Sequence, residues 1–152
     1  MAEAGTERTE RIIELLRERG ARLTNARRAV IDALAMARSH LTADDLGVLV
    51  QQSAPDIHIS TIYRTLDALE HLGLVDHVHL GHGRAIYHLT DQPHQHLVCE
   101  GCGAVVEVPD STFAQLADQL RQGYSFTIRP SHFAVLGRCA DCAGVGKIAS
   151  DH

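Results

Sequence analysis

The sequence contains no tryptophan, and aromatic residues make up only 4% of its 152 residues. Its apolar fraction of 45% is normal for a globular protein, which excludes disorder as the main state. A chain of this length has room for one ordinary domain or two small ones. Two small domains would each have little core, so we expect a metal or an oligomer interface to stabilise them.

Long apolar segments are also missing. The N-terminus has no signal-type apolar stretch, and no run is long enough to cross a bilayer. We therefore expect a cytoplasmic protein with no membrane partner. In that compartment the four cysteines are expected to bind metal rather than to form disulfides.

The chain lacks the basic balance of most nucleic-acid-binding domains, since its formal net charge is −5. Five arginines nevertheless lie close together between residues 17 and 28. Histidine is abundant, with 11 residues, and its special properties are titration near neutral pH and metal binding. The composition indicates metal binding more clearly than DNA binding.

The first half of the chain has the apolar spacing of helices. The predicted helices start near Thr9 and after the N-cap residues Thr24, Thr42 and Ser60. Gly20 and Gly73 are expected to end the first and the last of them. The residues expected to face inward are Val30, Ile31 and Leu34, then Leu46, Leu49 and Val50, then Ile62, Leu66 and Leu69.

After Gly73 the apolar period changes to two. Residues 74–80 and 84–89 read as strands joined by Gly81-His82-Gly83, which is a hairpin signal. Helices followed by a hairpin predict a winged helix, in which the last helix reads DNA and the hairpin rests on the DNA backbone. Asp91-Gln92-Pro93 is the predicted linker. Beyond it we expect strands at 104–108, 125–128 and 132–136 and a helix at 111–122.

The strongest signal is a pair of C-x₂-C units, formed by Cys99 with Cys102 and by Cys139 with Cys142. Each unit can present two thiolates from a tight turn, and four thiolates at tetrahedral geometry make a closed structural zinc site. The alternatives are redox motifs or buried free thiols. A redox motif needs only one such pair, so the spacing favours zinc.

The histidines include two H-x-H pairs, His77 with His79 and His94 with His96. In an extended segment alternate residues share a face, so both imidazoles of a pair can reach one ion. His40, His88 and His132 are scattered candidates. Taken singly, each is as well explained as a surface or core histidine.

Three segments carry a resemblance to a known family. They are residues 20–27, which read G-A-R-L-T-N-A-R, residues 59–66, which read I-S-T-I-Y-R-T-L, and residues 94–102, which read H-Q-H-L-V-C-E-G-C. Together they resemble the ferric-uptake-regulator family from about residue 9 to residue 142. The resemblance implies an α+β protein with a winged-helix DNA-binding domain at 1–90 and an α/β metal-binding dimerisation domain at 91–152.

The resemblance further implies a homodimeric repressor that binds a palindromic double-stranded operator when a regulatory divalent metal joins its domains. It is not expected to be an enzyme. The ligands carried over by position are His40, His88, His94 and His96, with Glu107 as an extra candidate. Many relatives have a carboxylate where this chain has His88, and a nitrogen-rich site suits Ni²⁺, Zn²⁺ and Cu²⁺ as well as Fe²⁺.

A second departure is that the family's H-H-D-H run here reads Pro93-His94-Gln95-His96, which lacks two ligands of a further site. The wing histidines His77 and His79, with His132, instead resemble the nickel-responsive branch, where the corresponding residues bind Ni²⁺. Nickel is therefore the favoured signal. The zinc-, iron- and peroxide-responsive branches remain alternatives, because the metal sensed follows supply as well as ligand type.

DNA contacts are expected from two helix starts. The predicted residues are Arg22, Thr24 and Arg27 at one and Ser60, Thr61, Tyr63 and Arg64 at the other. Two other classes compete with a regulator: a metalloenzyme with an open three-histidine site, and a zinc-ribbon interaction module. The chain has no H-E-x-x-H or H-x-E motif to supply a general base, which disfavours the enzyme.

Overall fold

The computed structural model describes residues 2–37, 40–79, 84–128 and 134–144. The chain divides into an N-terminal unit, residues 1–77 and 84–92, and a C-terminal unit, residues 78–83 and 93–152. Among the described residues, no helix has the length and apolarity needed to span a bilayer.

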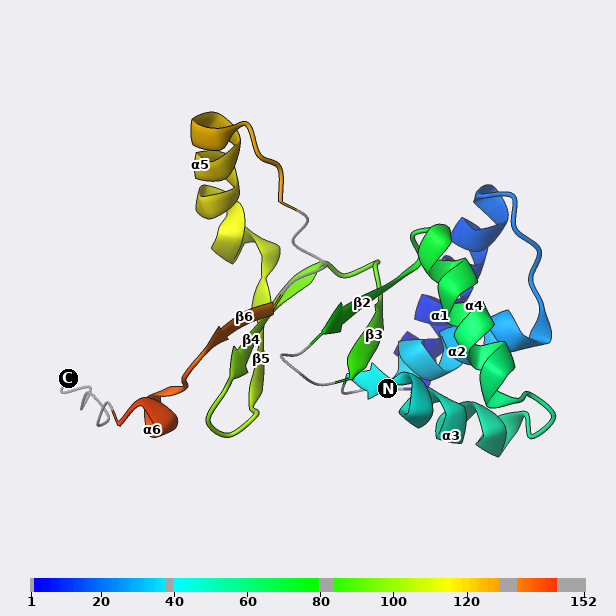
Figure 1. The fold of residues 1–152 in the computed structure, drawn as a ribbon. Coiled ribbons are helices and arrows are strands. Elements are labelled where there is room, and N and C mark those ends of the chain that lie inside the picture. The colour runs from blue at the N-terminus through cyan, green and yellow to red at the C-terminus, as the bar shows by residue number, and fades with distance from the viewer. Residues whose placement is uncertain (1, 38–39, 80–83, 129–133, 145–152) are drawn as a thin grey trace. The chain divides into compact units, whose positions relative to one another are not determined.

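Four helices build the N-terminal unit (Figure 1): α1 (Ala2–Glu18), α2 (Asn25–Met36), α3 (Ala43–Ser53) and α4 (Ile59–His71). The residues predicted to face inward on α2 and α4 are buried, as are Leu46 and Val50 on α3. The prediction for Leu49 is wrong, because it is 39% exposed. The buried stripe of α3 runs through Leu46, Gly47 and Val50, and Leu49 lies about 100° around the helix from Val50.

Local capping fixes most of the helix ends. The Thr24 hydroxyl accepts a hydrogen bond from the Arg27 backbone N–H at 3.2 Å, as predicted for an N-cap. Thr42 forms a capping box with Asp45, and this contact lowers the pKa of the Asp45 carboxyl. Gly73 follows α4 with a left-handed φ of 66°, which favours glycine.

One predicted cap is wrong. Ser60 is the second residue of α4, and His58 occupies the N-cap position without a side-chain hydrogen bond. The helix begins at Ile59, two residues before the predicted start at Thr61.

A three-stranded sheet has the order β1 (Leu41–Thr42), β3 (Ala85–Leu89) and β2 (Val75–His79). It belongs to the N-terminal unit except for Val78 and His79, the last two residues of β2, which fall in the C-terminal unit. The hairpin strands β2 and β3 were predicted, whereas the two-residue strand β1 was not. β1 pairs antiparallel with β3, placing Leu41 opposite Tyr87.

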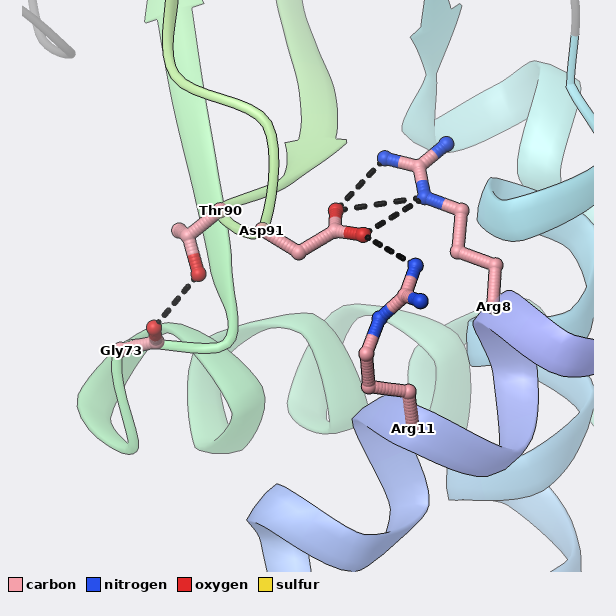
Figure 2. Close-up of polar contacts among 5 residues, drawn as sticks. All are labelled: Arg8, Arg11, Gly73, Thr90 and Asp91. Carbon is pink, nitrogen blue, oxygen red and sulfur yellow. Dashed lines mark hydrogen bonds and ion pairs between the residues drawn. The ribbon is translucent and has the colours of Figure 1, made fainter.

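The end of this unit is held by an ion pair. The Asp91 carboxylate accepts hydrogen bonds from Arg8 of α1 at 2.7 and 2.9 Å, and Arg11 lies 3.5 Å from it. Figure 2 shows both guanidinium groups facing this carboxylate, while the neighbouring Thr90 hydroxyl donates to the Gly73 carbonyl at 2.8 Å. The segment that leaves β3 is thereby fixed to α1 and to the end of α4.

The C-terminal unit contains a second sheet with the order β5 (Val105–Pro109), β4 (His94–Cys99) and β6 (Ala134–Gly137). β4 pairs antiparallel with β5 and parallel with β6. Between β5 and β6 the chain forms the 3₁₀ turn η1 (Asp110–Phe113) and helix α5 (Ala114–Tyr124), and it closes with the short helix α6 (Ala140–Ala143).

The strand predicted at 125–128 is wrong. Ser125 has a left-handed φ of 52° and ends α5, and the Phe126 N–H donates back to the Leu120 carbonyl at 3.2 Å. The alternating apolar residues Phe126 and Ile128 thus lie in irregular structure after the end of α5 rather than in a sheet. The strand predicted at 132–136 begins at Ala134 in the structure, and His132 lies outside the described residues.

Candidate metal centres and DNA-binding surface

The structure brings the four cysteines together in the C-terminal unit. Their sulfur atoms all lie within 4.8 Å of one another, and the Sγ atoms of Cys102 and Cys139 are 3.8 Å apart. A tetrahedral ion with zinc–sulfur bonds of about 2.3 Å needs sulfurs about 3.8 Å apart. The cluster therefore fits a structural zinc ion.

Backbone geometry explains how the two C-x₂-C units meet. The Gly103 N–H donates to the Cys99 carbonyl at 2.8 Å, and Gly103 has a positive φ of 75°. At Gly101 an added Cβ would lie 2.9 Å from the Sγ of Cys142. Gly101 is thus needed for the close approach of α6, which the sequence did not reveal because its partner is far along the chain.

The electrostatics of the cluster also suit a cation. Backbone N–H groups of Cys139 and Cys102 donate to the Cys99 sulfur and lower the pKa of its thiol to about 6. The thiols of Cys139, Cys102 and Cys99 raise the pKa of Cys142 to about 12. A divalent ion would offset the mutual repulsion of four thiolates, because it attracts every one of them at once.

A second cluster lies at the start of β4. The antiparallel register places Glu107 of β5 opposite His96, and ligand atoms of His94, His96 and Glu107 lie within 4.8 Å of one another. The two imidazole rings meet edge to face with centroids 4.7 Å apart, and His96 is buried. These three predicted ligands thus share one place in the C-terminal unit.

The other two residues predicted for this site belong to the N-terminal unit. His40 directly precedes β1, and His88 is in β3. Both are half-buried.

Gln95, which stands between the two histidines, is buried and its amide donates to Asp110 Oδ1 at 2.6 Å. The Gln95 side chain therefore links β4 to the 3₁₀ turn η1 of the same unit.

His77 and His79, the histidines of β2, have different surroundings. His77 Nδ1 lies 2.5 Å from Glu70 Oε1 of α4, and its ring lies 5.8 Å from that of Tyr87. Burial, followed by the charges of Glu70 and Asp67, raises the pKa of Tyr87. His79 is exposed at the end of β2. The contact with Glu70 was missed, because nothing in the sequence pairs a residue of α4 with this strand.

The predicted DNA-contacting residues of α4 lie on one exposed side of its first turns. Ile62, Thr65, Leu66 and Leu69 are buried, so Ser60, Thr61, Tyr63 and Arg64 face solvent. At the start of α2, Arg22 is exposed and its carbonyl accepts a hydrogen bond from the Arg27 guanidinium. Both helix starts thus present the predicted polar residues.

Known proteins resemble this chain over most of its length. Residues 18–136 match the model of the Ferric uptake regulator family. The Ferric uptake regulation protein of Bacillus subtilis (strain 168) is 32% identical over 142 residues, covering 90% of this chain and 95% of that protein. The Peroxide-responsive repressor PerR of Staphylococcus saprophyticus is 30% identical over 133 residues, covering 86% and 88%.

Solved structures agree with this match. A structure of the zinc uptake regulator complexed with zinc and DNA is similar at 27% identity and a TM-score of 0.64, covering 93% of this chain and 96% of that one. The similar fold, together with the clusters of cysteine and histidine, defines the class of protein as a metal-responsive regulator. The protein belongs to the ferric uptake regulator family.

Members of this family are transcriptional regulators and not enzymes, and they act as metal-binding, DNA-binding repressors. The expectation of a non-enzymatic metal-responsive regulator is therefore confirmed, and the metalloenzyme alternative is wrong. The expected mixed helix-and-sheet fold is confirmed by similarity to the family's structures, which have an N-terminal DNA-binding domain and a C-terminal dimerisation domain.

Proposed function

We propose that this protein is a cytoplasmic, homodimeric repressor that binds a palindromic operator when loaded with a regulatory metal, with nickel as the favoured signal. Residues 1–90 would be the winged-helix DNA-binding domain and residues 91–152 the dimerisation domain. The observation that carries the proposal is the cluster of His94, His96 and Glu107 at the start of β4, directly after the segment anchored by Asp91.

DNA recognition is assigned to α4. Arg64 would donate to a guanine or a phosphate, and Tyr63 would contact a thymine methyl, with N-terminal residues of the helix towards the bases. The exposure of both residues supports this, as does the DNA in the related zinc uptake regulator complex. Arg22, Thr24 and Arg27 at the start of α2 would contact phosphates. The Thr24 hydroxyl accepts the capping hydrogen bond of α2, so its O–H can still donate to a phosphate oxygen.

The matched experiment on α4 separates base readout from phosphate contact. Arg64→Ala should weaken binding to the selected operator by about 1–3 kcal/mol and relax its sequence preference. The exposed Arg17→Ala on α1 is the control for loss of one positive charge. Equal weakening on operator and random DNA would reduce Arg64 to a phosphate contact.

The regulatory switch is assigned to His40, His88, His94 and His96, with Glu107 as a further ligand. A ligand shifts a conformational equilibrium only through a difference in its affinity for the two states. Ligands drawn from both units supply that difference, because a metal bound by all of them favours one arrangement of the two units. Coupling of ordinary size, about 1–3 kcal/mol, would change operator affinity roughly 5- to 150-fold.

His96→Ala tests the switch. It should abolish metal-activated DNA binding and leave the zinc content of the cysteine site at one ion per chain. Gln95→Ala changes the neighbouring residue on the same strand and is the control. Unchanged operator affinity in His96→Ala would place the switch elsewhere.

The proposed nickel ligands are His77, His79 and His132. Their three imidazole nitrogens leave coordination positions open, and such a site suits Ni²⁺ better than tetrahedral zinc. The contact of His77 Nδ1 with Glu70 supports this, because in a neutral ring it keeps the proton on Nδ1 and makes Nε2 the ligating nitrogen. Joint substitution of His77 and His79 by Ala should remove Ni²⁺-dependent operator binding and affect zinc-dependent binding less.

Iron or peroxide sensing is the second candidate, favoured by the names of the similar proteins from Bacillus subtilis and Staphylococcus saprophyticus. Titrating chelated protein separately with Ni²⁺, Zn²⁺, Fe²⁺ and Mn²⁺ decides between them. Activation of the wild type by zinc or iron at far lower free concentration than nickel would overturn the nickel assignment.

A further inference from the structure

An exposed groove of about 370 Å³ lies within the N-terminal unit, beside the face of α4 assigned to DNA. It is lined by Asp44 from the first turn of α3, Tyr63 from α4, Tyr87 from β3, and Arg84, which directly precedes β3. The sequence predicted that the hairpin rests on the DNA backbone but named no hairpin residue among the DNA contacts. Arg84 is the cation that the hairpin brings to this groove.

The Asp44 carboxylate contacts both Arg84 and Tyr63 in this groove. Arg84 Nη1 donates to Asp44 Oδ2 at 2.6 Å, and the Tyr63 hydroxyl lies 3.5 Å from Asp44 Oδ1. Both members of the ion pair are exposed, with side chains 75% and 55% accessible for Arg84 and Asp44. An ion pair so open to water is weak and exchanges partners at little cost.

We propose that Arg84 is a further contact to the DNA backbone and that Asp44 is its competing internal partner. A guanidinium binds carboxylate and phosphate through the same fork of N–H donors. When a duplex docks on α4, the Arg84 guanidinium exchanges the Asp44 carboxylate for a phosphate oxygen. Asp44 thereby lowers affinity for every sequence and restrains non-specific binding. The inference rests on the proposed DNA-binding function and adds a residue pair to it.

The position of Tyr63 ties this exchange to base reading. Its hydroxyl is near the same carboxylate that holds Arg84, so occupation of the groove by phosphate changes the surroundings of both residues together.

The test uses the full-length, metal-loaded protein with two probes: a random-sequence duplex, and an operator that the wild type selects from a pool of random duplexes. Binding is measured by fluorescence anisotropy over a series of salt concentrations. Arg84→Ala should weaken both complexes alike and reduce the salt slope by about one, the loss of a single phosphate contact. Arg84→Lys should restore most of the slope.

Asp44→Asn should tighten binding to both duplexes, by up to about fivefold for an exposed pair of this kind. The matched control is Asp118→Asn, which removes the same charge from an equally exposed carboxylate (54%) paired with Arg121 in the C-terminal unit. In an Arg84→Ala background, Asp44→Asn should give no further gain. Circular dichroism verifies that each variant is folded.

An unchanged salt slope in Arg84→Ala overturns the backbone contact. A full gain from Asp44→Asn in the Arg84→Ala background overturns the exchange, because the carboxylate would then act on DNA by direct repulsion. A wild type that binds neither duplex with any metal overturns the DNA-binding function and this inference together, whereas operator binding with a normal Arg84→Ala slope overturns only the inference.

Discussion

The two units of this protein differ sharply in how much apolar surface they bury. Every residue of the main apolar core lies in the N-terminal unit, where four helices and the first sheet contribute to it. In the described part of the C-terminal unit, the buried apolar residues are Val78, Val98 and Cys99, and α5 buries none of its own.

Both units expose large apolar side chains, such as Met36 and Val48 in the N-terminal unit, but those of the C-terminal unit accompany very little buried core. Tyr124 is 79% exposed, and Val106, Leu116, Phe126 and Leu136 are exposed as well. An apolar cleft lined by Leu97, Val106 and Val135 runs to Cys139. Exposed apolar surface of this kind is typical of an interface. We therefore expect the N-terminal unit to be stabilised by its own core, and the C-terminal unit to depend on bound metal and a second chain.

Removal of zinc should break this contrast most severely. Cys102→Ser, or chelation of the wild type, should unfold the C-terminal unit and dissociate the dimer, because binding energy at a structural zinc site, about 10–16 kcal/mol in small zinc domains, is folding energy. The helices of the N-terminal unit should survive. Zinc content by mass spectrometry, hydrogen exchange and light scattering measure the three effects.

Asp141→Ala is the control, since Asp141 lies between Cys139 and Cys142 but is not part of the sulfur cluster. It should keep zinc and the dimer. A stable, zinc-free dimer of Cys102→Ser would mean that the cysteines do not stabilise this unit.

Two leucine substitutions sharpen the contrast further. Leu66→Ala on α4 should lower the free energy of unfolding by about 2–5 kcal/mol, because Leu66 is fully buried and its removal leaves a cavity. Leu116→Ala on α5, where the side chain is 44% exposed, should change chain stability by less than about 0.5 kcal/mol and weaken the dimer instead. Urea denaturation at several protein concentrations separates the two effects. An equal loss in both variants would contradict the comparison.

The sequence predicted most of the N-terminal unit because its signals are local. Apolar spacing, the hydroxyl of Thr24 and the glycine at position 73 act within one or two turns of the chain, and the structure contains each feature. The cysteine spacing was equally informative, since each C-x₂-C unit is a local turn. The four-cysteine cluster could therefore be predicted from spacing alone.

The remaining features depend on residues that meet only in the folded chain. The strand predicted at 125–128 failed because the left-handed Ser125 ends α5, which a period-two pattern does not report. The pairing of Asp91 with Arg8 spans 83 residues, and no periodicity encodes it. The proximity of Glu107 to His96 follows from strand register, which a single sequence does not determine.

The Asp91 ion pair should contribute a smaller, pH-dependent stabilisation to the N-terminal unit. Burial of Asp91 alone would raise its pKa, but hydrogen bonds and charge from Arg8 and Arg11 lower the pKa below the ordinary value of 3.8. Asp91→Asn should cost about 1–3 kcal/mol near neutral pH, since the side chain is only 7% exposed and its arginine partners lose a charged acceptor.

The lowered folded-state pKa of Asp91 determines how its contribution to stability changes with pH. The contribution is fully present above the unfolded-state pKa and is lost as pH falls through the folded-state value. Wild type and Asp91→Asn should therefore differ in urea denaturation at neutral pH and converge in acid below pH 3.8. Asp56→Asn, which changes an exposed carboxylate of the same unit, is the control. A gap between wild type and Asp91→Asn that widens in acid would contradict the assignment.

The smallest expected effect concerns a glycine of the C-terminal unit. In Gly101→Ala the new Cβ would lie 2.9 Å from the Cys142 sulfur, so α6 or the turn must shift and the four sulfurs lose their spacing. Zinc affinity should fall on the order of tenfold, as for loss of a residue that positions metal ligands. Gly123→Ala, in α5 with no atom within 4 Å of the added Cβ, should keep full affinity and slightly favour the helix. Competition for zinc against a chromogenic chelator measures both variants. Equal zinc affinity in the two variants would show that α6 adapts to a side chain at position 101. The zinc site would then accept a larger displacement of its surroundings than we expect of the apolar core in the N-terminal unit.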